Sequence, residues 1–462
     1  MMLTNLHGKK ILIMGLGLHG GGIGTVKFLA KEGAKLTVTD LRQKSILSPA
    51  LKALDGLKNI RYVLGRHRKE DFIKSDLIVK NPGVKPDSPF LKIAKKNNIP
   101  ITSDLGIFLK NCPGKIIGVT GTRGKSTTAY LIWRFLQEKF KRQSAPKASP
   151  SAGRPRIFLG GNIRKSALEF LPKIKDQDLV ILEFSSFQLH DLTQEKQSPN
   201  IAVITNILPD HLNWHKNFTD YVKAKKSIFA FQKRGDYLFI RDNNYLLKKL
   251  AKKTLFKLVL VKSNLSKGLE KLVDQNLGKH FQNSVVLAIA VAKHFKVENK
   301  IIQRVLKNFK GLEGRQGLVT TVGGVHWIND TTSTIPEATI AAIDRFAKLT
   351  KNTKGRLLLI IGGQDKKLDF KELAKNIKNK VAGLILLPGT ATEKLKKYLL
   401  PLKNGLEITE VKSMPEAVKK ASLLAKKGDF IVLSPGAASF GLFANEFDRG
   451  KQFVDAVKKY AR

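Results

Sequence analysis

Cysteine, acidic residues and long apolar runs are scarce in this 462-residue sequence. The single cysteine, Cys112, excludes an intrachain disulfide and fits a reducing compartment, so we expect a cytoplasmic protein. No stretch reaches the roughly 20 apolar residues that span a bilayer, and we expect no membrane partner. Aspartate and glutamate number 37 against 83 lysines and arginines, which gives a formal net charge of +46.

The surplus of positive charge, taken alone, favours nucleic acid or another anionic partner. The lysines, however, are spread along the whole chain, often as pairs such as Lys248-Lys249 and Lys419-Lys420. No aromatic RNA-binding signature lies among them. We therefore interpret the charge as solvated helix faces and predict no specific nucleic-acid partner. A nucleic-acid-binding ATPase is the alternative that the charge supports.

Apolar strand-like runs alternate with helical patterns along the chain, which predicts an α/β fold with mainly parallel sheets. The chain is too long for one ordinary core, and its elements group into three domains. We expect a Rossmann-like N-terminal domain over 1–113, a central P-loop ATPase-like domain over 114–312 and a Rossmann-like C-terminal domain over 313–462. The basic, Ser/Pro-rich segment 139–156 predicts a surface loop. The clearest strands are 10–14, 36–39, 77–79, 116–120, 179–182, 201–205, 357–361 and 430–433.

Glycines follow the first predicted strand in a dinucleotide-binding pattern. Gly15, Gly17 and Gly20 form this turn, and Asp40 ends the next strand. Such a turn lets the backbone approach a diphosphate at a helix N-terminus. Taken alone, the pattern permits an NAD-dependent oxidoreductase as well as a protein that binds another nucleotide.

The strongest single motif is a variant phosphate-binding loop, GVTGTRGKSTT at 118–128. An apolar strand leads into a glycine-rich turn, after which Lys125 and Ser126 open a helix. Lys125 would reach the β- and γ-phosphates of a nucleotide, and the Ser126 hydroxyl would ligate Mg²⁺. The usual Walker spacing wants glycine at position 119, where this sequence has Val119.

Further motifs follow in the order found in the Mur ligase family, and the whole chain resembles that family. The SSFQL segment is characteristic of the members that add D-glutamate. The motifs after the phosphate loop are EFSSFQL at 183–189, NILPDHL at 206–212, YVKAKKSI at 221–228, GLEGR at 311–315, WIND at 327–330, GGQDK at 362–366 and LSPGAAS at 433–439.

The resemblance implies an ATP-dependent, ADP-forming amide ligase of peptidoglycan precursor synthesis. Its reaction would add D-glutamate to UDP-N-acetylmuramoyl-L-alanine through an acyl phosphate. The resemblance implies ATP and two Mg²⁺ ions as cofactors, these two substrates as partners, and a monomer without an obligatory protein partner. Another Mur-type ligase, with a different amino acid or acceptor, is the alternative within the family.

The resemblance also assigns roles to individual residues. The implied catalytic residues are Lys125, Glu183, His211 and Lys225, and the implied metal ligands are Ser126, Glu183, His211 and Lys225. The implied ATP-binding residues are Gly121, Thr122, Gly124, Lys125, Ser126, Thr127, Asn283, Arg315 and Asp330. The implied UDP-substrate-binding residues are Gly17, Leu18, His19, Gly20, Asp40, Arg42, Asn162 and Ser185. The implied D-glutamate-binding residues are Thr334, Lys366, Ser439 and Phe440.

Lys225 takes the position of a carbamylated lysine in the family. Carbamylation turns an ammonium into an anionic oxygen ligand that suits Mg²⁺. The reaction needs the neutral amine, so we expect burial or nearby positive charge to depress the pKa of Lys225. We expect Lys226 to point elsewhere, because adjacent helical positions do not share a face.

The sequence departs from the family pattern in the adenine-binding segment, which reads HFQNS at 280–284. Both asparagines of the family motif are altered there, and Asn283 is the expected substitute. In addition, Gly314 stands where some members have histidine, and Thr332 where some have lysine.

Overall fold

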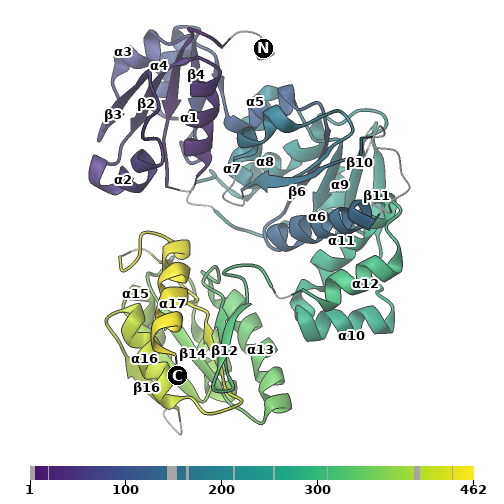
Figure 1. The fold of residues 1–462 in the computed structure, drawn as a ribbon, viewed down its shortest axis with the longest axis vertical. Coiled ribbons are helices and arrows are strands. Elements are labelled where there is room, and N and C mark those ends of the chain that lie inside the picture. Colours follow the sequence, from purple (N-terminus) through teal and green to yellow (C-terminus); the bar gives the residue numbers. More distant parts are fainter. Residues whose placement is uncertain are drawn as a thin grey trace. The chain divides into compact units, whose positions relative to one another are not determined.

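The computed structural model contains three sheets, one within each of the predicted domains (Figure 1). It describes residues 6–18, 20–142, 153–162, 166–211, 214–252, 255–309, 311–399, 406–439 and 441–461. The chain forms two compact units, Met1–Glu270 with Phe281–Val305 and Lys271–His280 with Leu306–Arg462. The α/β fold with three domains is confirmed, while the domain boundaries at 113 and 312 stay predictions.

The first sheet is parallel throughout, with the strand order β3-β2-β1-β4-β5. Ile11 and Ile13 of β1 pack toward α1, whereas Leu12 and Met14 pack toward α3 and α4. Both faces are therefore covered, which explains why the strand reads as a continuous apolar run. The strands are β1 Lys10–Met14, β2 Lys35–Asp40, β3 Ile60–Leu64, β4 Leu77–Lys80 and β5 Ile101–Thr102; the helices are α1 Gly21–Lys31, α2 Lys44–Lys52, α3 Lys69–Ile73, α4 Pro89–Lys96 and α5 Asp104–Asn111.

The second sheet is also parallel, with the order β11-β10-β9-β6-β8-β7. The chain runs from β6 to one side of the sheet and later returns to the other side, so β6 lies between β8 and β9. Open α/β sheets bind ligands at such a switch point, outside the carboxyl ends of the strands. The strands are β6 Lys115–Thr120, β7 Ile157–Gly161, β8 Leu179–Glu183, β9 Ile201–Ile204, β10 Tyr237–Arg241 and β11 Lys257–Val261.

The helices and short 3₁₀ turns between residues 125 and 307 connect these strands and follow the last of them. They are α6 Lys125–Arg142, η1 Ala167–Glu169, η2 Leu171–Lys173, α7 Ser186–Glu195, α8 Phe218–Ala230, α9 Tyr245–Leu250, α10 Lys267–Asn276, η3 Lys279–Phe281, α11 Gln282–His294 and α12 Asn299–Lys307. The prediction of a loop over 139–156 was wrong at its start, because α6 continues to Arg142. Lys139 donates a hydrogen bond to the carbonyl of Phe295, which anchors this end of the helix. Residues 143–152 lie outside the described residues.

One apolar core continues from the first sheet into the second. Val26 of α1 and Phe108 of α5 belong to the same cluster of buried side chains as Phe170 and Leu189, which lie in the central domain. The two N-terminal domains therefore form a single unit and share buried surface, which favours a fixed arrangement between them.

The third sheet has the order β12-β13-β17-β14-β15-β16, and only the β12–β13 pair is antiparallel. Gly323 and Gly324 join that pair with positive φ angles of 56° and 79°, as a tight hairpin turn requires. The strands are β12 Gly317–Val322, β13 Val325–Asn329, β14 Leu357–Gly362, β15 Gly383–Leu387, β16 Glu407–Glu410 and β17 Phe430–Leu433; the helices are α13 Pro336–Thr353, α14 Lys371–Lys380, α15 Thr390–Leu399, α16 Met414–Leu424 and α17 Glu446–Tyr460.

Two apolar clusters cover the faces of the third sheet. Leu359 packs with α13, α14 and α15, whereas its neighbour Ile360 packs with α16 and α17. Within the described part of the chain, no helix combines the length and the apolar character needed to cross a bilayer.

Candidate functional site

The phosphate-binding loop connects the carboxyl end of β6 to the first turn of α6, as the sequence predicts. Gly121 has φ 149°, and a Cβ there would lie 1.8 Å from the Thr205 hydroxyl oxygen. Gly124 has φ 81°, and its Cβ would lie 2.3 Å from the Ser284 hydroxyl oxygen. Both positions therefore exclude larger residues, and the loop leads directly into a helix N-terminus, which favours anions.

Thr205 and Asn206, which directly follow β9, stabilise the conformation of this loop. Thr205 donates its hydroxyl hydrogen to the carbonyl of Arg123 over 2.6 Å. Asn206 accepts from the Arg123 N–H at 3.0 Å and donates its side-chain amide to the Arg123 carbonyl at 3.1 Å. Its own carbonyl accepts from the Thr122 N–H at 3.0 Å. This supporting role was not apparent from the NILPDHL motif.

A buried cluster of oxygen donors lies beside the loop, where β8 ends. The Ser126 hydroxyl donates to Glu183 Oε2 over 2.5 Å, and Asn162 donates to Glu183 Oε1 over 2.9 Å. Ser126 and Glu183 are 7% and 1% exposed. The structure thus brings together three residues that the sequence analysis assigned to metal and substrate binding.

This oxygen cluster fits Mg²⁺. Magnesium prefers oxygen ligands and is usually held by one or two protein groups together with substrate phosphates and waters. The hydroxyl of Ser126 and the carboxylate of Glu183 are donors of that kind. Among the described residues, no group of three or more His, Cys, Asp or Glu forms a ready metal site. A site completed by a bound nucleotide agrees with that arrangement.

Lys225 is buried in the central domain, although most lysines of the chain are exposed. Only 1% of it is accessible, and its ammonium donates to the Gly121 carbonyl at 2.8 Å and to the Thr120 hydroxyl at 3.3 Å. Burial, together with the positive charge of Lys125, lowers the pKa of Lys225 well below its ordinary value. The expected depression is confirmed. Lys226, the next residue of α8, is exposed, as predicted.

His211 lies on a left-handed turn with φ 54° after the strand β9. Its Nε2 atom is 3.6 Å from the carboxylate of Asp210, and its ring packs edge-on against Phe187 at 4.9 Å. The charge of Asp210 also acts on Lys225, opposing the depression of its pKa. Asp210 and Lys225 are therefore close enough to interact electrostatically. Asp210 was not among the predicted site residues.

The glycine turn of the first domain is closed around Asp40. The Asp40 carboxylate is 5% exposed and accepts from the N–H groups of Gly17 at 3.2 Å and Arg42 at 2.9 Å. The Arg42 guanidinium lies 3.6 Å from the same carboxylate and is half exposed. Gly20 precedes the first turn of α1 with φ 82°. Leu18 is partly exposed beside it, and the predicted residue His19 lies outside the described residues.

Asn81 is a residue of this turn that the sequence analysis missed. A Cβ at Gly15 would lie 2.9 Å from the Asn81 Cβ, and one at Gly17 would lie 3.2 Å from its amide nitrogen. Its N–H donates to the Met14 carbonyl at 2.8 Å. The Asn-Pro-Gly turn that directly follows the buried strand β4 was the available sequence signal.

Two further predicted residues have clear local roles. Ser185 caps α7 in a capping box with Gln188, so its hydroxyl lies at the start of the SSFQL helix. Asn283 is exposed and accepts from an Arg241 guanidinium nitrogen at 2.6 Å. The neighbouring Ser284 contacts the phosphate loop at Gly124. The altered HFQNS segment therefore still lies beside that loop.

The predicted D-glutamate residues of the third domain come from neighbouring segments. Lys366 donates to the Thr334 hydroxyl at 3.1 Å. Gln364 and Ala438 exchange backbone hydrogen bonds, 2.9 Å and 3.0 Å long, which join the GGQDK turn to the LSPGAAS segment that contains Ser439. The predicted residue Phe440 lies outside the described residues.

Asp330 is buried inside the third domain. Its carboxylate accepts from the hydroxyls of Ser333 at 2.5 Å and Ser434 at 2.9 Å, and from the Gln316 N–H at 3.1 Å. Burial raises the pKa of Asp330 to about 7, while these bonds and the charge of Arg315 act in the opposite direction. The carboxylate that the family resemblance assigns to ATP thus also organises the start of this domain.

We expect Asp330→Asn to stabilise the third domain at pH 8.5 and to change its stability little at pH 4. Because the folded-state pKa lies above the unfolded value near 3.9, stability falls as the pH rises from about 4 to about 7. The full penalty is up to about 4 kcal/mol. Calorimetric unfolding of both proteins across this pH range measures it. A difference in melting temperature that does not change with pH would contradict the titration of Asp330.

Arg449 is a buried structural residue that the sequence did not reveal. It is fully buried and donates to the Thr331 carbonyl at 2.8 Å, the Thr331 hydroxyl at 3.2 Å and the Ala437 carbonyl at 3.1 Å. Burial lowers its pKa to about 10. Arg449 thereby ties α17 to the LSPGAAS segment.

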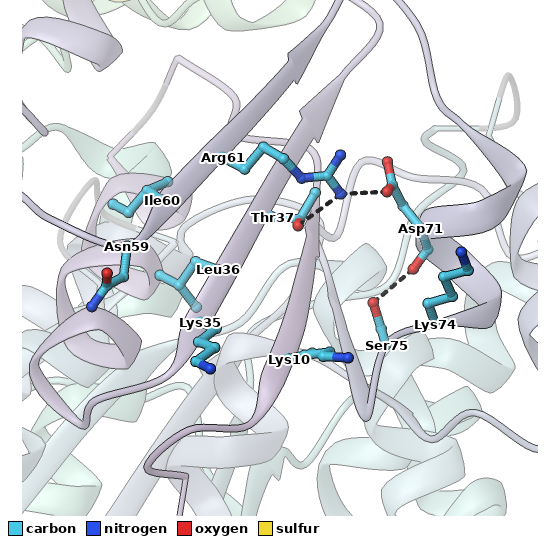
Figure 2. A pocket seen from close by; sticks show the side chains of 10 residues that line it. All are labelled: Lys10, Lys35, Leu36, Thr37, Asn59, Ile60, Arg61, Asp71, Lys74 and Ser75. Carbon is cyan, nitrogen blue, oxygen red and sulfur yellow. Dashed lines mark hydrogen bonds and ion pairs between the residues drawn. The ribbon is translucent and has the colours of Figure 1, made fainter.

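A basic groove of about 590 Å³ lies in the first domain, far from the glycine turn. Figure 2 shows Lys10 and Lys35 at the amino ends of their strands, and Arg61 between Thr37 and Asp71. Strands of five or six residues separate this edge from the glycine turn by roughly 17–20 Å. Among the described residues of its walls, no buried side-chain atom lacks a hydrogen-bond partner. We interpret the groove as a solvated basic surface.

Three successive parts of the chain match descriptions of one protein family. "Mur ligase MurD-like, N-terminal domain" matches residues 9–103, "Mur ligase middle domain" matches 119–306, and "Mur ligase, glutamate ligase domain" matches 314–436.

Curated relatives match the chain over nearly its whole length. The UDP-N-acetylmuramoylalanine--D-glutamate ligase of Roseiflexus sp. (strain RS-1) is 38% identical over 98% of this chain and 99% of its own length. The protein of the same name from Borreliella afzelii (strain PKo) is 37% identical over 99% of both chains.

Solved structures share the fold at much lower identity. UDP-N-acetylmuramate-alanine ligase MurC from Thermotoga maritima is 17% identical with a TM-score of 0.61, over 98% of this chain and 99% of that one. MurF ligase from the same organism, in complex with ADP, is 13% identical with a TM-score of 0.56, and the match covers 98% of this chain and 95% of that one. With three successive family matches and relatives of 37–38% identity along its whole length, the chain belongs to the Mur ligase family.

Proposed function

We propose that this chain is an ATP-dependent, ADP-forming amide ligase that adds D-glutamate to UDP-N-acetylmuramoyl-L-alanine in peptidoglycan precursor synthesis. The full-length similarity to ligases of that name is the observation that supports this choice of substrates. The protein works in the cytoplasm as a monomer, without an obligatory protein partner.

The reaction makes an amide from a carboxylate, whose oxygen is a poor leaving group. The acceptor carboxylate attacks the γ-phosphorus of ATP, ADP leaves, and an acyl phosphate forms. The amine of D-glutamate then attacks the carbonyl carbon, and inorganic phosphate leaves with the former carboxylate oxygen. Positioning and charge neutralisation supply most of the catalysis in such phosphoryl transfers.

The phosphate loop binds the triphosphate of ATP in this proposal. The backbone of Gly121, Thr122 and Gly124 faces the phosphates, Thr127 lies in the first turn of α6, and Lys125 neutralises the charge of the transferring group. Asn283 lies near the adenine. Arg315 and Asp330 of the third domain complete the proposed set of ATP-binding residues.

Ser126 and Glu183 would hold one Mg²⁺ ion, and His211 with carbamylated Lys225 would hold a second. When bound, these ions neutralise phosphate charge and orient oxygen atoms. Two observations support the second site. Lys225 is buried beside the phosphate loop, and its depressed pKa favours the neutral amine that reacts with CO₂.

The glycine turn of the first domain binds the UDP part of the acceptor. The backbone of Gly17, Leu18 and Gly20 faces the diphosphate at the N-terminus of α1. Asp40 shapes this turn through its bonds to the backbone. The half-exposed Arg42 contacts the nucleoside, and Asn162 and Ser185 contact the acceptor nearer to the reacting carboxylate.

The third domain binds D-glutamate. Lys366 and Thr334 are already joined by a hydrogen bond of 3.1 Å, and Ser439 follows the segment that pairs with the same turn. An ammonium and two hydroxyls are suitable partners for the carboxylates of a dicarboxylic amino acid.

Phosphate release from ATP is expected to require both UDP-N-acetylmuramoyl-L-alanine and D-glutamate. A panel that omits each substrate in turn measures this requirement. The panel also offers L-lysine or meso-diaminopimelate with a UDP-muramoyl dipeptide. A preference for one of those pairs would overturn the choice of substrates and leave the ligase class intact.

The charge of +46 makes a nucleic-acid-dependent ATPase the alternative from another class. DNA binding through many phosphates would lose affinity linearly with the logarithm of salt concentration, with a slope of several units. ATP turnover stimulated by DNA, and not by the substrate pair, would favour that function.

A further inference from the structure

Two ion pairs cross the boundary between the first and central domains, and both end on α7. Lys80, the last residue of β4, lies 2.8 Å from the carboxylate of Asp191, and both side chains are 7% exposed. Lys110 of α5 pairs with Glu195, which is also 7% exposed. Asp191 and Glu195 are four residues apart and therefore lie on one face of the helix.

The Lys80 pair differs from the Lys110 pair because Lys80 also holds the turn that follows β4. Its ammonium donates to the Val84 carbonyl at 3.2 Å. Asn81, within this turn, packs against Gly15 and Gly17 of the glycine turn of the first domain. We call that glycine turn the UDP turn, after its proposed ligand. A second bond joins the turn to the central domain, since the Trp214 indole N–H donates to the Gly83 carbonyl at 3.4 Å.

Helix α7, to which Lys80 is paired through Asp191, also adjoins the proposed catalytic residues of the central domain. Helix α7 begins at the Ser185 cap, directly after Glu183 and Phe184. Its Thr193 hydroxyl lies 2.6 Å from the Ser227 hydroxyl of α8, the helix that contains Lys225. Asp191 thus lies on a helix that begins just after the predicted metal ligand Glu183 and contacts the helix of the predicted metal ligand Lys225.

We propose that Lys80 and Asp191 are positioning residues, which fix the UDP turn relative to α7 and so hold the acceptor carboxylate in line with the phosphate loop. The proposal rests on the proposed function, because it concerns alignment of that acceptor. A misplacement of about 1 Å in reacting groups can slow a reaction roughly a hundredfold. A buried charged pair with a further bond to the turn restricts such displacement more than apolar contacts do.

The test compares two double variants, each of which replaces both members of one ion pair with uncharged residues. They are Lys80→Met/Asp191→Asn and the matched control Lys110→Met/Glu195→Gln. We expect the first to lower kcat by between about tenfold and a hundredfold and to raise KM for the UDP substrate, with KM for ATP within about twofold. The control should keep kcat within about twofold, even where its melting temperature falls by a similar amount.

The single variant Lys80→Arg, with Asp191 unchanged, should keep most of the kcat of the unmodified protein, because the guanidinium keeps the charge and the donors. Equal loss of kcat in both double variants, in proportion to their melting temperatures, would overturn the proposal. Normal turnover of Lys80→Met/Asp191→Asn would do so too. Failure of the proposed function is a separate result, because the unmodified protein would then show no turnover with the substrate pair.

Discussion

Lys225→Ala is expected to lose ligase activity by roughly a thousandfold, near the upper end for loss of one charged group at a reacting phosphate. The lysine is buried beside the phosphate loop, and its depressed pKa favours the neutral amine that the proposed carbamylation would need. In the proposed mechanism a carbamate on Lys225 would supply anionic oxygen to Mg²⁺, which alanine cannot do. Steady-state turnover at saturating ATP measures the loss.

Short-chain carboxylates such as acetate or propionate are expected to restore part of this activity. A small carboxylate fits the space that the shortened side chain leaves and brings back an oxygen ligand. Rescue also separates the chemical role from misfolding, since an unfolded variant would not respond. Lys226→Ala is the matched control, because Lys226 is the exposed neighbour on the same helix and its variant should turn over normally. Equal losses in both variants without rescue would refute carbamylation.

Lys125→Ala is expected to lower kcat by at least about a hundredfold, which corresponds to ~3 kcal/mol of transition-state stabilisation. Lys125 opens α6, directly after the glycine loop, and its ammonium donates to the Thr122 carbonyl at 2.9 Å. In the proposed mechanism the ammonium would reach the transferring phosphoryl group from this position and neutralise its charge.

The fold should tolerate this change, because a positive charge in the first turn of a helix opposes the helix dipole. Lys141→Ala is the matched control, since Lys141 is exposed in the last turn of the same helix. Circular dichroism and melting temperature establish that both variants are folded. Near-normal turnover of a folded Lys125→Ala protein would exclude the phosphate-loop role.

Local patterns were sufficient to predict the phosphate loop. A buried strand, a glycine turn and a helix start are short-range features, and β6, the loop and α6 follow one another as predicted. The need for glycine at 121 and 124 also arises from backbone geometry, although the contacting atoms belong to Thr205 and Ser284. The ordered motifs also predicted the family, which the full-length relatives confirm.

Pattern alone did not predict which charged residues become buried. Without the family resemblance, Lys225 is one lysine among many, and Lys80 ends an ordinary strand. Lys225 is buried by packing of α8 against β6, and Lys80 pairs with Asp191, 111 positions away. Arg449 is likewise buried through contacts with Thr331, 118 positions away.

The sequence by itself determined the α/β architecture, the phosphate loop and the family, because each depends on periodicity or on motifs of a few adjacent residues. The tertiary structure alone decided the environments of Lys225, Asp330 and the Lys80–Asp191 pair. Burial and pKa depend on desolvation and on charges brought near by distant segments. Those quantities exist only once the sheets and helices have packed, and no local pattern encodes them.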